Sequence, residues 1–159
     1  MQDAPVQTVR LREIEGTDLP TLFLHQADPA ACRMAVVNPR GAEAFEAHWA
    51  KILSDPETVA RAILADGVLV GSISCFRMND QDCVGYWIAR EHWGRGIASR
   101  ALALLLAEVT IRPLYARAAR TNGASIKVLE RCGFRLTGYH HAPADDRYPA
   151  CEEALFTLG

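Results

Sequence analysis

The chain has 159 residues, half of them hydrophobic, and it carries 17 Lys and Arg against 19 Asp and Glu, for a formal net charge of −2. This length suits one domain with a sizeable core, and the hydrophobic share argues against a disordered chain. The balanced charge gives no electrostatic reason to expect a nucleic-acid or anionic-membrane partner.

The five cysteines are an odd number without a CxxC pair, which favours reduced, buried thiols and a cytoplasmic location. Met1 to Val9 lacks an apolar core of signal-peptide length. The longest nearly unbroken apolar run, Ala101 to Ala107, is too short to span a bilayer.

In the N-terminal third, near alternation of apolar and polar residues predicts a strand from Val6 to Ile14. Thr17 and Asp18 are typical of a helix start, and a short helix is expected through His25. After a break at Asn38 to Gly41, apolar spacing predicts a second helix from Ala42 to Leu53.

Three antiparallel strands are predicted in the middle of the chain: Thr58 to Ala65, Val68 to Phe76 and Cys83 to Ala89. The Asp66-Gly67 pair is a strong hairpin signal between the first two. Cys75 and Cys83 are expected to face each other across the second hairpin as packed thiols.

The C-terminal third contains two more predicted helices and three more strands, without a linker or repeat. The helices are Ile97 to Ile111 and Asn122 to Cys132, the latter ended by Gly133, and the strands are Leu114 to Ala119, Phe134 to His140 and Glu152 to Leu158. A polar loop, His141 to Ala150, separates the last two strands. This order predicts a single α/β (α+β) domain with a central sheet covered by helices.

The first informative motif lies in Tyr86 to Ser99, where a strand leads through Gly94-Arg95-Gly96 into a helix. Unpaired N–H groups and the positive dipole end at a helix start, with glycines that allow close approach, suit a phosphate or pyrophosphate. The motif is neither a P-loop nor GxGxxG. A glycine turn that only starts a helix is an equally good interpretation of these residues alone.

The second motif, Asn122 to Phe134, places Asn122 and Ser125 three residues apart at a helix start beside a strand end. By itself this pair fits an ordinary N-cap and first-turn residue.

Together the two motifs resemble the GNAT superfamily of acyl-CoA-dependent N-acetyltransferases, and most closely its branch of ribosomal-protein N-terminal acetyltransferases. The family pattern is Gln or Arg, two residues, Gly, one residue, then Gly or Ala; here Trp93, Gly96 and Ala98 stand at its fixed positions. The resemblance implies a GNAT-like fold: a mixed, mostly antiparallel, twisted sheet of six to seven strands flanked by about four helices.

The resemblance also implies an activity, transfer of an acetyl group from the cosubstrate acetyl-CoA to a primary amine without a metal. Ser125 would protonate the departing sulfur, and the backbone N–H near Ile88 would face the thioester carbonyl. Amides from Arg95 to Ser99 would hold the pyrophosphate, and Lys127 or Arg131 would touch the nucleotide end. The full set expected to bind acetyl-CoA is Tyr86, Trp87, Ile88, Ala89, Trp93, Gly94, Arg95, Gly96, Ile97, Ala98, Ser99, Asn122, Ser125 and Lys127.

This chain departs from the pattern at the acid–base pair. Bacterial ribosomal-protein alanine acetyltransferases have a glutamate on the fifth strand and a tyrosine in the next helix, and an ungapped match puts Arg117 and Leu129 there. The base is therefore open, with six candidates that are each more typical of solvated surface: Glu153, Asp145, Asp146, Glu91, His48 and His140. A non-catalytic acyl-CoA-binding or sensing module is the alternative function.

The acceptor also stays open between a protein N-terminus and a small amine, and a homodimer is expected from the resemblance only. Phe45, Trp49 and Ile52 are interpreted as core that borders the acceptor pocket. The acidic loop from His141 to Ala150 would favour a cationic amine if it closed over that pocket. The spacing of His140, His141 and Cys151 fits no zinc pattern.

Overall fold

The computed structural model describes residues 5–159, so the first four residues of the stretch inspected for a signal peptide lie outside it. It contains one seven-stranded sheet in the order β1-β2-β3-β4-β5-β7-β6. The strands are β1 Val9–Glu13, β2 Val59–Ala65, β3 Val68–Met78, β4 Gln81–Ile88, β5 Leu114–Ala119, β6 Arg135–Ala142 and β7 Cys151–Leu158. All neighbours pair antiparallel except β4 and β5, which confirms the predicted mixed, mostly antiparallel sheet.

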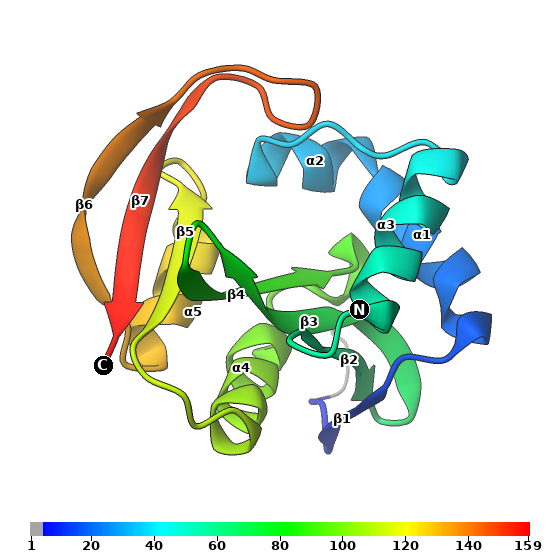
Figure 1. Ribbon diagram of the computed structural model, residues 1–159. Coiled ribbons are helices and arrows are strands. Elements are labelled where there is room, and N and C mark those ends of the chain that lie inside the picture. Colours follow the sequence, from blue (N-terminus) through cyan, green and yellow to red (C-terminus); the bar gives the residue numbers. More distant parts are fainter. Residues whose placement is uncertain (1–4) are drawn as a thin grey trace.

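Five α-helices surround the sheet, one more than the approximate four expected (Figure 1). They are α1 Leu19–Ala27, α2 Pro29–Ala35, α3 Ala42–Ser54, α4 Ile97–Glu108 and α5 Gly123–Arg131, and two 3-10 turns are Gly16–Asp18 and Arg90–His92. The sequence analysis missed α2, which has only seven residues and ends at Val36 with φ of 56°. A left-handed valine in place of glycine gives no recognisable stop signal.

Several predicted boundaries move. The first strand is shorter than expected, and α4 ends at Glu108 rather than Ile111 because Val109 turns extended, with φ of −101° and ψ of 108°. The expectation for the two hairpin cysteines was wrong. The register pairs Cys75 with Val84 and Cys83 with Phe76, and strand alternation then puts the two thiols on opposite faces of the sheet.

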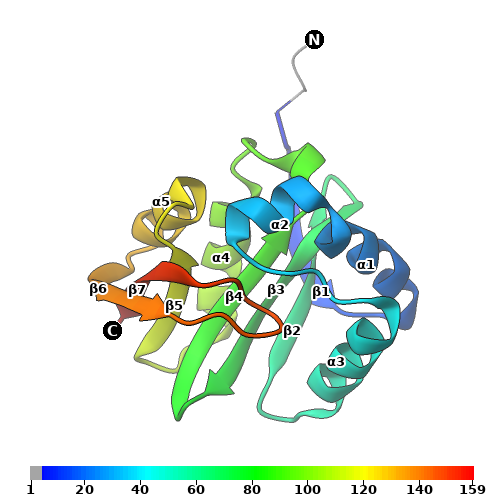
Figure 2. The same ribbon diagram turned by 90° about the horizontal axis from the view of Figure 1, so that it is seen from above.

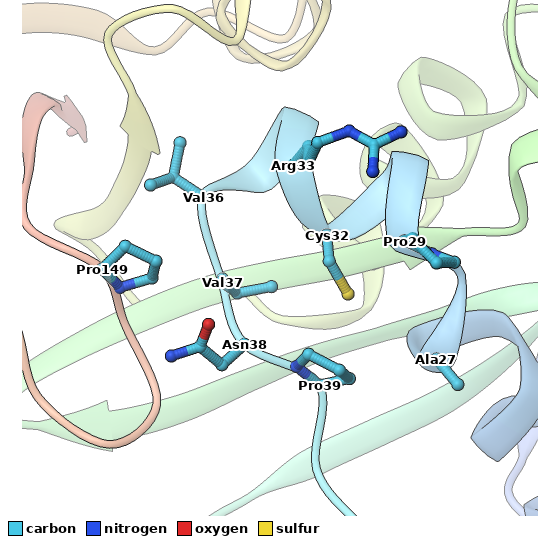
Figure 3. Close-up of a pocket in the computed structure, with 9 residues that line it drawn as sticks. All are labelled: Ala27, Pro29, Cys32, Arg33, Val36, Val37, Asn38, Pro39 and Pro149. Carbon is cyan, nitrogen blue, oxygen red and sulfur yellow. The ribbon is translucent and has the colours of Figure 1, made fainter.

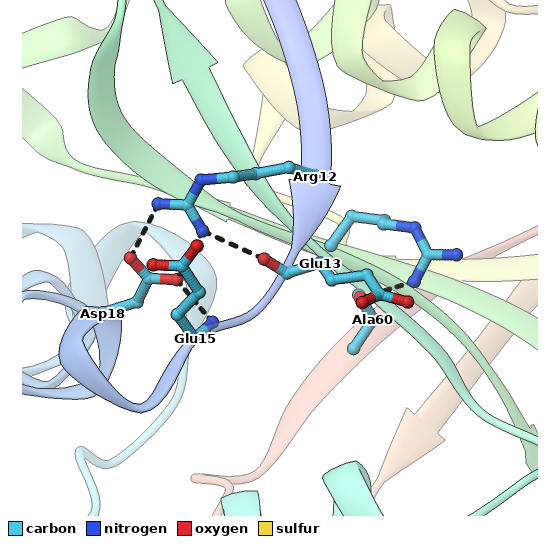
Figure 4. Close-up of polar contacts among 6 residues, drawn as sticks. Arg12, Glu13, Glu15, Asp18 and Ala60 are labelled. Atoms are coloured by element: carbon cyan, nitrogen blue, oxygen red, sulfur yellow. Dashed lines mark hydrogen bonds and ion pairs between the residues drawn. The ribbon is translucent and has the colours of Figure 1, made fainter.

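A partly buried ion pair connects β1 to the 3-10 turn that precedes α1 (Figure 4). Asp18 is 5% exposed and accepts two bonds from the Arg12 guanidinium, at 2.7 and 2.8 Å, and one from the N–H of Glu15 at 2.8 Å. The Arg12 bonds hold the pKa of Asp18 below its usual value. Asp18 does stand before α1, but its side chain makes no cap bond there because it is engaged by Arg12.

The core divides into two clusters, one on each face of the sheet. Figure 2 shows these two sides, with α1 and α2 in front of the sheet and α4 behind it. The main cluster joins the sheet to α4 and α5 through side chains such as Ile73, Leu102 and Leu129. A smaller one joins α1 and α3 to β2 and consists of Leu22, Phe45, Trp49 and Ala60. Within residues 5–159 no helix has the length and apolar character needed to cross a membrane.

Candidate active site

A wedge opens between the two parallel strands at the centre of the sheet. β4 and β5 pair at one position, Cys83 with Tyr115. β4 continues five residues beyond that point, to Ile88, as the partner of β3, and β5 continues to Ala119 as the partner of β7. The strands therefore separate, and the polar backbone edge of β4 faces the gap.

Backbone direction decides which groups of β4 face this wedge. The N–H of Ala89 donates to the Val70 carbonyl at 2.8 Å, whereas Ile88 lies opposite Gly71. Since donors alternate between the two sides of an antiparallel strand, the N–H and C=O of Ile88 point away from β3, toward the wedge. The indole Nε1 of Trp93 donates to that carbonyl at 2.9 Å. The Ile88 N–H therefore faces the wedge as a donor, as does the N–H of Tyr86 two residues earlier.

In the turn after β4, both glycines adopt the left-handed backbone conformation that glycine favours. Gly94 and Gly96 adopt φ of 75° and 74°, and nothing lies within 4 Å of a Cβ built on either one. Gly96 is the N-cap of the 12-residue α4, so the N–H groups of its first turn have no partner within the helix. The buried hydroxyl of Ser99, in that first turn, also lacks a hydrogen-bond partner in the described chain. The N–H groups of this first turn point to where an anion would be stabilised by the helix dipole.

Tyr86 reaches across the wedge from β4 to the start of α5. Its hydroxyl lies 2.7 Å from Ser125 Oγ and 3.3 Å from the Ser125 carbonyl. Burial raises the pKa of Tyr86 to about 12, so the phenol stays protonated at neutral pH. The structure thus brings together two residues that the sequence analysis assigned separately, and it pairs their hydroxyls.

Other residues that were predicted to bind the cofactor lie at the start and on the surface of α5 or on the opposite face of the sheet. Asn122 is the N-cap of α5, and its side-chain oxygen accepts from the Ser125 N–H at 3.2 Å. Lys127 and Arg131 are exposed on that helix. Trp87 points to the opposite face of the sheet, where its indole N–H donates to the His25 carbonyl at 3.0 Å.

A cavity of about 140 Å³ lies on the α1 and α3 face, over β3 and β4, and we call it the α3 pocket. Its wall combines apolar side chains of α1 and α3 with the strand residues of the wedge edge, including Tyr86 and Trp87. The predicted bordering residues Phe45, Trp49 and Ile52 all line it. Its other lining residues are Leu22, His25, Gln26, Arg40, His48, Ser72, Ser74, Gly85 and Arg147.

Of the six candidate bases, His48 alone lines the α3 pocket. Burial, and after it the charges of Arg40, Arg147 and Lys51, lower the pKa of His48 to about 4. Its imidazole is therefore neutral at pH 7 and can accept a hydrogen bond from an amine.

The other candidates have structural partners or lie in solvent. Glu153 lies 3.6 Å from Arg117 in an ion pair, and Asp145 accepts the N–H groups of Arg147 and Tyr148 to close a loop turn. Glu91, Asp146 and His140 are exposed.

Sequence reasoning missed three charged or titratable groups of the α3 pocket: His25, Arg40 and Arg147. They come from α1, from the segment before α3 and from the loop between β6 and β7, which reaches over toward α2 (Figure 1). No local pattern links positions this far apart in the chain. The loop contributes Arg147 to the lining, and neither Asp145 nor Asp146.

A larger, open hollow of about 590 Å³ lies between α2, the segment after it and Pro149 (Figure 3). Its ionisable groups are Cys32 and the exposed Arg33. Burial raises the pKa of the Cys32 thiol, which donates to the Gln26 carbonyl at 3.1 Å. This hollow therefore offers no acid–base pair, unlike the wedge and the α3 pocket.

Comparison with known proteins gives a family match over most of the chain. A family model described as an acetyltransferase (GNAT) domain matches residues 8–135. Among curated proteins, YdaF of Bacillus subtilis strain 168, whose name provisionally assigns it as a ribosomal N-acetyltransferase, is 32% identical over 112 residues. That match covers 64% of this chain and 61% of the relative, so the chain spans about three fifths of the length of YdaF.

Solved structures share the fold at lower identity. The spermidine N-acetyltransferase of Vibrio cholerae, solved with CoA and spermine, is 19% identical with a TM-score of 0.77, covering 94% of this chain and 95% of that one. RimJ of Mycobacterium smegmatis, solved with CoA-disulfide, is 21% identical with a TM-score of 0.76, covering 94% and 81%. RimL, a ribosomal L7/L12 alpha-N-protein acetyltransferase solved with CoA, is 20% identical with a TM-score of 0.78, covering 97% and 96%.

Proposed function

The chain belongs to the GNAT acetyltransferase family, and on that premise we propose that it transfers the acetyl group of acetyl-CoA directly to a primary amine held in the α3 pocket. The observation that carries the proposal is the wedge between β4 and β5, with the first turn of α4 at one end and the paired hydroxyls of Tyr86 and Ser125 across it.

The residues present fit a thioester carrier with a diphosphate. The first-turn amides of α4 and the two left-handed glycines, Gly94 and Gly96, form an anion cradle in which a side chain on either glycine would be strained. The wedge-facing backbone of β4 supplies hydrogen bonds to an amide-rich arm, as an added strand would. Lys127 and Arg131, exposed on α5, stay proposals for the nucleotide end.

In the reaction the amine nitrogen bonds to the acetyl carbon, the carbon–sulfur bond breaks, the amine loses a proton and the sulfur gains one. The Ile88 N–H stabilises the oxyanion, a role typically worth about 3 kcal/mol. Either hydroxyl of the 2.7 Å pair can be the donor, and Tyr86 is protonated. When the Tyr86 hydroxyl donates to Ser125 Oγ, the Ser125 proton is free to pass to the sulfur in the wedge.

Loss of the amine proton does not require a strong base in the pocket. An α-amino group has a pKa of about 8, so part of it is already neutral near physiological pH. Neutral His48 then orients the amine by accepting a hydrogen bond, and its low pKa directs the released proton onward to water. Positioning of this kind can supply about 7–11 kcal/mol of barrier reduction in favourable cases.

A free-thiol assay over a panel of amines and peptides, beside calorimetry with CoA, tests the proposal. We expect thiol release that depends on both acetyl-CoA and an amine. Tight CoA binding without thiol release from any acceptor would instead favour the non-catalytic sensing module, and absence of CoA binding would overturn both functions.

Gly96→Glu tests the anion cradle itself. At φ of 74° a glutamate is strained, and its carboxylate repels the diphosphate, so CoA affinity should fall by about two orders of magnitude. Gly16→Glu adds the same charge at a glycine with open space and without positive φ, and should leave CoA affinity unchanged. Equal CoA affinity in both variants would refute the phosphate site.

A further inference from the structure

The α3 pocket has an unusual charge for a site that receives an amine. Among the described residues 5–159, its lining contains two arginines and two histidines, and no aspartate or glutamate. Burial is the main cause that lowers the pKa of each histidine, so both imidazoles are neutral near pH 7. The pocket therefore carries two positive charges, both on guanidinium groups, where a polyamine would need negative ones.

Hydrogen bonds to the backbone of Arg40 hold this residue in place, and Arg40 lines the pocket. The side chain of Gln26, 7% exposed, donates to the Arg40 carbonyl at 3.0 Å and accepts from the Arg40 N–H at 2.8 Å. The side chain of one buried glutamine thus binds both the N–H and the C=O of Arg40. Burial, followed by the nearby charge of Arg147, lowers the pKa of Arg40.

Arg147 is brought to the same pocket from the other end of the chain. The segment before α3 and the β6–β7 loop exchange bonds: the Asn38 N–H donates to the Arg147 carbonyl at 2.7 Å, and Arg147 Nη1 donates to the Asn38 carbonyl. Asn38 Nδ2 also donates to the Asp146 carbonyl at 3.3 Å. Two loops are therefore joined so that their arginines share one cavity.

None of the six ion pairs in the described part of the chain involves Arg40 or Arg147. Two partly desolvated like charges repel each other, and an anion bound between them would offset that cost. Guanidinium groups are also well suited to carboxylate and phosphate, because their planar donors match both oxygens of such groups.

We propose that the acceptor is a primary amine that also carries a carboxylate or phosphate group, which Arg40 and Arg147 bind in the α3 pocket while the amine faces the wedge. This inference rests on the proposed function, since it names the acceptor class of that site. It places polyamines among the poor substrates.

Matched pairs of amines test the charge requirement by thiol release. Leucine and phenylalanine are compared with their amides, O-phosphoethanolamine with ethanolamine, and short peptides with an acidic second residue with their Asn or Gln counterparts; spermidine is the cationic probe. At least one anionic member should exceed its neutral partner by about tenfold or more in kcat/KM, mainly through KM. The pair with the largest difference identifies whether the enzyme recognises an amino-acid carboxylate, a phosphate or an acidic peptide side chain.

Arg40→Gln should reduce that preference about tenfold while CoA affinity stays at the wild-type value. Arg33→Gln, an exposed arginine of α2 outside the α3 pocket, is the matched control and should retain the preference. Arg147→Lys keeps the charge on the loop and should lose less than Arg147→Gln. An Arg40→Gln enzyme with an intact preference would overturn the proposal, as would a wild-type enzyme that uses spermidine or the neutral amines equally well.

A binding measurement separates this inference from the proposed function. CoA without an acetyl group forms a dead-end complex, which is titrated calorimetrically with the same probes. Binding of an anionic probe that is lost in Arg40→Gln supports the anion subsite even if no acceptor releases thiol, in which case only the proposed catalysis fails. If no anionic probe binds in preference to its neutral partner, the subsite is refuted while the assignment of CoA binding stands.

Discussion

The smallest unit of the proposed chemistry is the contact between Tyr86 and Ser125. One hydroxyl comes from β4 and the other from α5, and they meet at 2.7 Å across the wedge. The positions that resemblance assigned to an acid–base pair hold other roles here: Leu129 is 1% exposed in the main core, and Arg117 pairs with Glu153. In the proposed mechanism, the hydroxyl pair of Tyr86 and Ser125 supplies the proton donor instead.

Ser125→Ala is expected to lower kcat about 100-fold with little change in CoA affinity, because it removes the proton donor while leaving the anion cradle intact. Tyr86→Phe should give a smaller loss, since Ser125 keeps its own proton. Pre-steady-state and steady-state thiol release, beside calorimetry with CoA, separate the two quantities. A wild-type kcat in Ser125→Ala would remove this residue from the mechanism.

His48 makes a prediction about stability rather than rate. Its pKa falls from 6.5 in the unfolded chain to about 4 in the fold, so the unfolded state binds the proton first as pH drops. Stability is therefore lost between pH 6.5 and pH 4, and His48→Gln should flatten that dependence by about 1–2 kcal/mol. Urea unfolding across this pH range measures the slope.

His141→Gln, which removes an exposed imidazole from β6, is the control and should keep the wild-type slope. An unchanged slope in His48→Gln would mean that this imidazole is not held neutral by the fold.

At the scale of elements, the contact between β3 and β4 fixes the edge of the wedge. A Cβ added to Gly71 would lie 2.0 Å from the Trp87 carbonyl oxygen, a backbone atom that has no room to move within the sheet. Trp87 in turn donates to the His25 carbonyl on α1. One glycine thus allows β4 to approach β3 closely enough to hold both the wedge and the α3 pocket.

Gly71→Ala should therefore destabilise the protein by about 3 kcal/mol or more, as overpacking against backbone does. Gly85→Ala is the matched control on β4, because its Cβ would meet only the Phe76 ring, at 3.4 Å, and it should cost under about 1 kcal/mol. Chemical denaturation of the two variants measures their free energies of unfolding. Similar values for Gly71→Ala and Gly85→Ala would contradict the close approach of β3 and β4.

For the whole molecule, the two core clusters serve different purposes. The main cluster packs the sheet against α4 and α5, beneath the glycine turn for which anion binding is proposed. The smaller cluster, between the sheet and α1 with α3, forms the floor of the α3 pocket. Loss of packing in either cluster should lower stability. Loss in the smaller cluster should also weaken binding of the acceptor, whereas loss in the main cluster should not.

Leu102→Ala, at a fully buried position of the main cluster, should cost about 2–5 kcal/mol of stability and leave both KM values unchanged at temperatures where the protein is folded. Phe45→Ala should cost a similar amount but also raise the acceptor KM, with CoA affinity retained. Denaturation and two-substrate kinetics on the same preparations test this division. It fails if Phe45→Ala alters CoA affinity as strongly as acceptor KM.

The chain order of strands and helices, the glycine turn and the N-cap at Asn122 could all be predicted because each depends on neighbours within a few residues. Apolar periodicity, positive φ at glycine and side-chain capping leave a local signature in the sequence. The same locality explains the misses. Helix α2 ends at a left-handed valine without a stop signal, and the hairpin register that separates Cys75 from Cys83 depends on strand pairing.

The sequence by itself determined the kind of fold and the glycine turn at the start of α4. Only the tertiary structure decided that β4 and β5 separate after one paired position, that Tyr86 meets Ser125, and that Arg40 and Arg147 share a pocket in which none of the described lining residues is Asp or Glu. The physical reason is that buried surface and long-range hydrogen bonds can be contributed by any residue that the fold brings near, however distant it is in the chain. Asn38 and Arg147 are such a hydrogen-bonded pair. Such partners leave no pattern along the chain.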